Sequence, residues 1–61
     1  MPAAIIIANR EINRRTGLEE IIASHGIDLA TDQEFQVPQV DPRVLGATFD
    51  REYGEYVLDF D

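Results

Sequence analysis

The sequence contains no cysteine among its 61 residues. Disulfides and cysteine-ligated zinc sites, which stabilise many small domains, are therefore excluded. A chain of this length forms one domain and buries only about 60% of the surface that its unfolded form exposes. We therefore treat residues 1–61 as a single small acidic domain that depends on compact packing, self-association or a partner for its stability.

Long apolar runs are also lacking. The longest run, residues 3–8, is far shorter than the roughly 20 residues that span a membrane. No basic segment precedes it, as one would in a signal peptide. We expect no membrane partner and a cytoplasmic location, the host cytoplasm if a phage encodes the chain.

Catalytic motifs are absent as well, because the sequence has neither a glycine-rich phosphate loop nor an HExxH motif. The single serine and the single histidine, Ser24 and His25, are adjacent. On a helix they would point about 100° apart, which excludes a direct dyad. Asp28, Asp32 and Glu34 lack the spacing of a calcium loop. We expect no enzyme, no cofactor and no metal.

The charge is distributed unevenly. Residues 1–17 carry three arginines and one glutamate, a net +2, whereas residues 18–61 carry eleven carboxylates and two arginines, a net −9; together they give −7. This net negative charge disfavours direct binding to nucleic acid. It favours a protein partner with a basic surface or a nucleic-acid-binding groove. Alternatively, the charge only keeps a small protein soluble.

Two local patterns predict the secondary structure of the N-terminal half. Residues 2–8 include three consecutive isoleucines, which favour a strand, and residues 9–15 allow a short helical turn. Thr16 and Glu19 fit a capping box, and Gly26 fits a helix C-terminus. A helix is therefore predicted over 17–25, with apolar spacing supplied by Leu18, Ile21, Ile22 and His25.

The C-terminal half is predicted to be mostly extended. Residues 28–41 have no helical period and form a strap over the core, anchored by Phe35 and Val37 among others. Asp41-Pro42 begins a short turn that ends at Gly46. Residues 47–61 fit a hairpin in which Phe49 faces Leu58, or a helix with an aromatic stripe. The β-branched and aromatic content favours the hairpin.

The expected fold class is therefore α+β. A small antiparallel or mixed sheet, built from the N-terminal strand and the C-terminal hairpin, is covered by one helix at about 17–25.

The last thirteen residues contain four of the five aromatic side chains, interleaved with acids. These aromatics form either the core or a surface for a basic, partly apolar groove. In addition, an exposed edge at 55–60 could add a strand to a partner's sheet. The predicted partner-binding residues are Asp50, Glu52, Tyr53, Glu55, Asp59, Phe60 and Asp61.

A second candidate surface is the basic cluster of Arg10, Arg14 and Arg15. It either binds the acidic patch of a second copy, giving a homo-oligomer, or is solvated and paired within the chain.

These features favour a small acidic inhibitor or adaptor that occupies a basic site on another protein. Its carboxylates would stand in for phosphates, as in a nucleic-acid mimic. Phage anti-defence proteins, including anti-CRISPR proteins, and antitoxins share this size and charge, which is an analogy at the level of class. The alternative is a structural or accessory subunit of a virion or of a multi-subunit complex.

Overall fold

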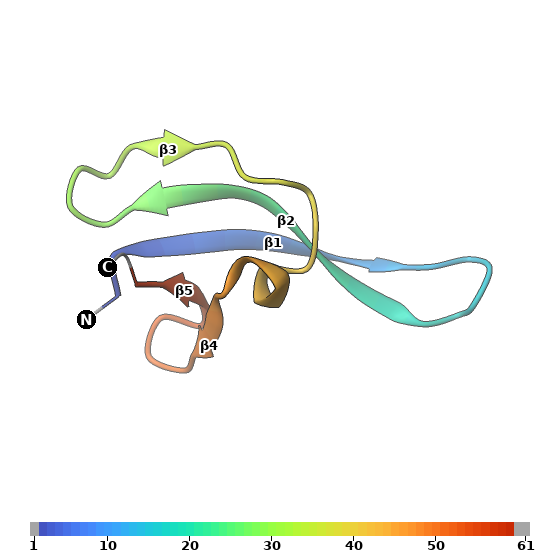
Figure 1. Ribbon diagram of the computed structural model, residues 1–61. Helices are drawn as coiled ribbons and strands as arrows, with labels where there is room; N and C mark the ends of the chain where they lie inside the picture. The colour runs from blue at the N-terminus through green and yellow to red at the C-terminus, as the bar shows by residue number, and fades with distance from the viewer. Residues whose placement is uncertain (1, 60–61) are drawn as a thin grey trace.

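The computed structural model describes residues 2–59, which form one five-stranded antiparallel sheet with the strand order β3-β2-β1-β5-β4 (Figure 1). A short 3-10 helix, η1, spans Pro42–Leu45. The strands are β1 (Ala4–Ile12), β2 (Glu19–Asp28), β3 (Glu34–Phe35), β4 (Thr48–Asp50) and β5 (Glu55–Leu58).

The expected α+β class is wrong, because residues 2–59 contain no α-helix and the predicted helix 17–25 lies mostly within β2. Its local helix signals are overridden by pairing with β1 along the whole length of β2. The adjacent residues Ile21 and Ile22 lie on opposite faces of this strand, where β-branched side chains pack well. Gly26, expected to end a helix, lies inside the strand opposite Ile6 and Phe35.

The N-terminal strand is confirmed but extends to Ile12, so the helical turn expected at 9–15 is also wrong. The connection to β2 is a turn closed by a hydrogen bond from the Asn13 N–H to the Leu18 carbonyl. The Asn13 side chain accepts hydrogen bonds from the N–H groups of Arg15 and Thr16. Gly17 adopts φ +72° there, a conformation that glycine reaches without steric cost.

A β-bulge interrupts the pairing of β1 with β2. Ile7 pairs with His25 and Ala8 with Ala23, so Ser24 is the extra residue. Bulges increase the local right-handed twist, and the two strands cross in the view of Figure 1 just beyond this region. We call residues 8–23, which project from the rest of the sheet, the arm.

The C-terminal hairpin is confirmed as β4 and β5, but its register differs from the expected one. Phe49 pairs with Tyr56 rather than with Leu58. The two rings contact edge to face, with centroids 5.5 Å apart. The hairpin turn begins at Asp50, whose carboxylate accepts hydrogen bonds from the N–H groups of Glu52 and Tyr53.

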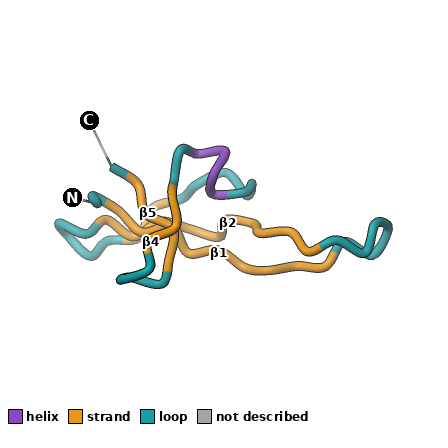
Figure 2. Tube along the Cα trace, turned by 90° about the horizontal axis from the view of Figure 1, so that it is seen from below, coloured by secondary structure: helices purple, strands orange, loops and turns teal. Residues whose placement is uncertain are grey.

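One face of the sheet carries the core, and we call it the covered face. The strap predicted over the core is confirmed for Phe35 and Val37, which pack with Leu45 against buried Ile6, Ala23 and Ala47. The predicted short turn is also confirmed as η1: the Asp41 side chain caps its start, and Gly46, with φ 87°, ends it. Figure 2 shows η1 lying over one side of the strands.

The opposite side, which we call the open face, has no helix or strap over it in residues 2–59 (Figure 2). Strand alternation and the observed register assign its side chains. This face is largely apolar at its centre. One row crosses four strands through Glu34, Ile27, Ile5 and Val57.

Candidate binding surfaces

The centre of the open face is a strip of aliphatic side chains. Ile5 is paired with Ile27 on one side and with Val57 on the other. Val57 is buried by its neighbours, and the four isoleucines are half-buried. Since isoleucine is usually buried in folded proteins, this arrangement makes the strip a candidate interaction surface. The aliphatic strip consists of Ile5, Ile7, Ile22, Ile27 and Val57.

Carboxylates border the aliphatic strip. Glu34 on β3 is next to Ile27, while Asp50 and Glu55 form a cross-strand pair at the other edge of the sheet. His25 is the one basic side chain that the register places on this face, and its Nε2 lies 4.0 Å from Glu34 Oε1. The border of the open face is therefore acidic, and two copies of this face would repel each other.

Two further glutamates extend the acidic border onto the arm. Glu11 and Glu20 are directly opposite each other on the open face, and both are exposed. Like charges directly opposite across two strands are destabilising. The Asn13 side-chain amide donates to Glu20 Oε1 at 3.1 Å, which satisfies an oxygen but leaves the charge. A basic side chain from outside would remove this repulsion.

The structure separates the partner-binding residues predicted from the sequence. Asp50 and Glu55 belong to the border of the open face, and Glu52 and Tyr53 are exposed in the turn between β4 and β5. Asp50 also holds that turn through its two backbone hydrogen bonds. Asp59 follows the far end of β5, so it does not join the turn. Phe60 and Asp61 lie outside the described residues.

The expectation of an exposed edge at 55–60 is wrong for Glu55–Leu58, because β5 is an inner strand between β1 and β4. A different edge is open. β5 pairs with β1 only from Ala4 to Ile6, and no other described strand follows on that side. The rest of β1, from Ile7 to Ile12, therefore has an unpaired edge.

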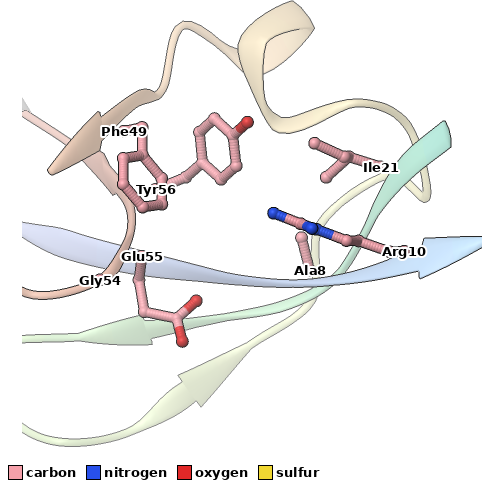
Figure 3. Close-up of a pocket in the computed structure, with 7 residues that line it drawn as sticks. All are labelled: Ala8, Arg10, Ile21, Phe49, Gly54, Glu55 and Tyr56. Atoms are coloured by element: carbon pink, nitrogen blue, oxygen red, sulfur yellow. The ribbon is translucent and has the colours of Figure 1, made fainter. Parts of the chain in front are cut away.

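A hollow of about 410 Å³ lies beside the start of β5, where β1 continues toward the arm (Figure 3). Phe49 and Tyr56 form one side, and Arg10 reaches into the same space from the arm, while the Glu55 carboxylate points away from the rings. This combination of aromatic rings and a guanidinium was missed in the sequence, because Arg10 and Tyr56 are 46 positions apart. Its lining residues are Ala8, Arg10, Ile21, Phe49, Gly54, Glu55 and Tyr56.

The basic cluster is only partly paired within the chain. Arg10 Nε lies 3.4 Å from Glu19 Oε1, and both side chains are exposed. Exposed pairs of this kind contribute about 0.2–1 kcal/mol. Arg14 and Arg15 are exposed in the turn at the tip of the arm, next to Ile12 and Leu18, whose exposed fractions are 72% and 66%.

Ser24 and His25 contact each other, contrary to the geometry expected for a helix. Ser24 Oγ is 3.1 Å from His25 Nδ1, at the point where the bulge interrupts β2. Among residues 2–59, Glu34 is the only carboxylate paired with His25, and its distance of 4.0 Å is beyond hydrogen-bonding distance. The carboxylate therefore does not orient the ring as it would in a catalytic triad.

The acids at 28–34 shape the turn after β2. Asp28 Oδ1 accepts a hydrogen bond from the Ala30 N–H at 2.8 Å, and the Asp32 N–H donates to the Asp28 carbonyl. Asp32 has a positive φ of 60°. Within residues 2–59, no three His, Asp or Glu side chains gather as a metal site would require.

The Asp41 carboxylate is perturbed by Arg43. The guanidinium donates to both carboxylate oxygens, at 3.0 and 2.6 Å, and the Arg43 N–H adds a third hydrogen bond. These bonds, the side-chain ones first, lower the pKa of Asp41 to about 2. In turn, the same pair raises the pKa of Arg43. This ion pair fixes the start of η1.

Comparison of the chain with protein-family models, with characterised proteins and with solved structures finds no match. The surfaces described above are therefore the basis for inferring function. Residues 2–59 also contain no helix of the length and apolarity that crossing a bilayer would need.

Proposed function

We propose that this chain is a small cytoplasmic protein-binding module that acts as an inhibitor or adaptor by occupying a basic, partly apolar site on another protein. The open face is its binding surface. The aliphatic strip supplies apolar contact, and the acidic border selects lysine and arginine on the partner.

The observation that carries this proposal is the pairing of Glu11 with Glu20. The pair destabilises the free protein, since two carboxylates face each other without a cation between them among the described residues. A lysine or arginine of the partner, placed between them, would turn this repulsion into attraction. Functional surfaces often retain residues that lower stability in this way.

The acids of the β4–β5 hairpin belong to the same proposal. Asp50 and Glu55 lie on the open face, and Glu52 and Tyr53 extend the contact into the adjoining turn. Exposed charges of this kind steer a basic partner toward the surface and are screened by salt. The complex should therefore weaken as ionic strength rises.

The test compares neighbouring residues on opposite faces of β2. Glu20→Arg places a cation opposite Glu11, so we expect it to stabilise the free protein by about 0.2–1 kcal/mol and to weaken partner binding about tenfold. Glu19→Arg makes the same change of charge on the other face, beside Arg10. It should destabilise the free protein slightly and leave binding unchanged.

The measurements are thermal unfolding of each purified variant and a salt-gradient elution of host proteins from each immobilised variant. Proteins that bind the open face should leave the Glu20→Arg column at lower salt than the Glu19→Arg column. Equal elution from the two columns, or retention that does not depend on salt, would contradict the proposal.

A second candidate function, an accessory subunit of a larger assembly, is favoured by the shape of the molecule. Its radius of gyration is 12.1 Å, with extents of 39 × 22 × 17 Å, whereas a compact chain of this length has a radius of about 10.5 Å. The arm accounts for the difference. A cooperative thermal melt of the isolated monomer would count against an obligate subunit, and no melt would favour it.

A further inference from the structure

We propose that the unpaired edge of β1, from Ile7 to Ile12, binds an extended peptide segment of a partner as an additional strand, with one apolar side chain of that segment filling the neighbouring hollow. This site is separate from the open face, so it does not depend on the function proposed above.

The backbone of the arm supplies the first argument. β1 pairs with β2 through Ile12 but with β5 only through Ile6. Beyond Ile6, alternate residues of β1 direct their N–H and C=O groups toward a side where no described strand pairs with them. Such an edge is a template for another strand.

The hollow supplies the second argument. It lies beside the free part of β1, with Ala8 and Arg10 on one side and Gly54, Glu55 and Tyr56 on the other. Ala8 is small, and Phe49 and Tyr56 present aromatic surface to this space (Figure 3). The exposed fraction of Phe49, 56%, is high for an aromatic side chain in a sheet. A large apolar side chain on the added strand would cover it.

The charge of Arg10 supplies the third argument. Its Nε is near Glu19, and its side chain, which is 77% exposed, reaches into the hollow (Figure 3). Its terminal nitrogens remain for a second carboxylate. The residue opposite Arg10 on the added strand should therefore be aspartate or glutamate, because opposite charges directly across two strands attract.

Ile12 completes the pattern, since it lies on the same side of β1 as Ala8 and Arg10 and is exposed. The preferred segment thus has the order apolar, any residue, acidic, any residue, apolar. This order is the same in both chain directions. A second copy of β1 is a poor occupant, because symmetric pairing would set Arg10 against Arg10 or move the apolar residues out of register.

The experiment uses the full chain and a blocked seven-residue peptide of sequence Thr-Val-Thr-Glu-Thr-Phe-Thr, titrated by NMR. We expect shifts of the backbone amides from Ile7 to Ile12 and of the Phe49 and Tyr56 rings, without comparable shifts on the open face. Shifts confined to the aliphatic strip would overturn the proposal. Shifts confined to the edge of β2 that faces away from β1 would also overturn it.

Two N-methylated forms of the peptide provide the matched control, one methylated on odd-numbered amides and the other on even-numbered amides. In an added strand only one of these sets faces β1. One form should therefore bind at least about tenfold more weakly, and the other should bind like the parent. Equal affinity of the two forms would show that no strand is added.

Charge exchange tests the role of Arg10. Replacing the peptide's glutamate by lysine should weaken binding about tenfold, and the Arg10→Glu variant should restore binding of the lysine peptide. The dispersion of the amide signals verifies that this variant is folded. If the Arg10→Glu variant does not restore binding of the lysine peptide, Arg10 does not contact the acidic residue of the added strand. A dimer of the free chain that excludes the peptide would identify a second copy as the occupant and overturn the proposal.

Discussion

Asp41 accepts three hydrogen bonds from Arg43, and this pair has a measurable consequence at low pH. The pKa of Asp41 is lowered from 3.8 to about 2. A carboxyl group whose pKa is lower in the folded state stabilises the fold above its unfolded pKa. That contribution is therefore complete above pH 4 and is lost as the pH falls from about 4 through 2.

We expect NMR titration of the Asp41 side chain to give a midpoint near 2 in the wild type. Arg43→Ala should return the midpoint toward the usual value of 3.8, while Arg51→Ala, in the β4–β5 turn, should leave it unchanged. A normal midpoint in the wild type would show that the ion pair does not persist in solution.

The close packing of Phe35 on Gly26 leads to a second testable prediction. Gly26 pairs with Phe35, and a Cβ atom added at this position would clash with the Phe35 ring. The glycine therefore provides the space in which the ring packs on the sheet. Gly26→Ala should destabilise the fold by about 1–3 kcal/mol, because the ring and β3 must move.

Thermal unfolding measures this loss, which corresponds to roughly 4–8 °C for each kcal/mol in a domain of this size. In the Phe35→Ala background, Gly26→Ala should cost much less, since the clash is gone. Additive losses in the double variant would mean that the ring does not cover Gly26.

Among the elements, the arm differs from the rest of the sheet, which we call the body. The arm has two strands, whereas the body has up to five. Isolated two-stranded hairpins are marginally stable in water. Hydrogen exchange should therefore be at least about tenfold faster for the amides of Glu11 and Glu20 than for those of Ile5 and Ile27, because the arm opens locally. Uniform exchange rates along β1 and β2 would contradict this expectation.

The elements that were predictable from the sequence are those fixed by neighbouring residues. The isoleucines of β1, the Asp41-Pro42 start of η1 and the aromatic hairpin at β4 and β5 all carry their signals locally. The helix at 17–25 was wrong because its signals, Thr16 and Glu19 above all, compete with pairing to β1. In the structure the Thr16 hydroxyl accepts from the Leu18 N–H within a turn.

The candidate site was also predictable only in part, because some of its residues come together only through strand pairing. The acidic residues Asp50 and Glu55 stood out by composition, but the pairing of Glu11 with Glu20 depends on a register between two strands. Once a turn at 13–18 is recognised, residues whose numbers add to 31 lie opposite each other, and Glu11 and Glu20 are such a pair. A helix assigned to this region hides that relation.

At the scale of the whole molecule, the uneven charge of the sequence is partly evened out by folding. The positive N-terminal segment folds back against Glu19 and Glu20, so the arm from 8 to 23 has three arginines and three glutamates and no net charge. The negative charge remains on the body. The basic partner proposed above would therefore approach the body first, and the arm would contribute contacts of both signs.

Ser24 affects the orientation of the arm relative to the body. As the unpaired extra residue of β2, it changes the twist between the body and the arm without joining the core. Loss of this one residue would leave each cross-strand partner in place, Ile7 with His25 and Ala8 with Ala23, but would straighten the ribbon. Deletion of this one residue should therefore redirect the whole projection relative to the isoleucines of the body.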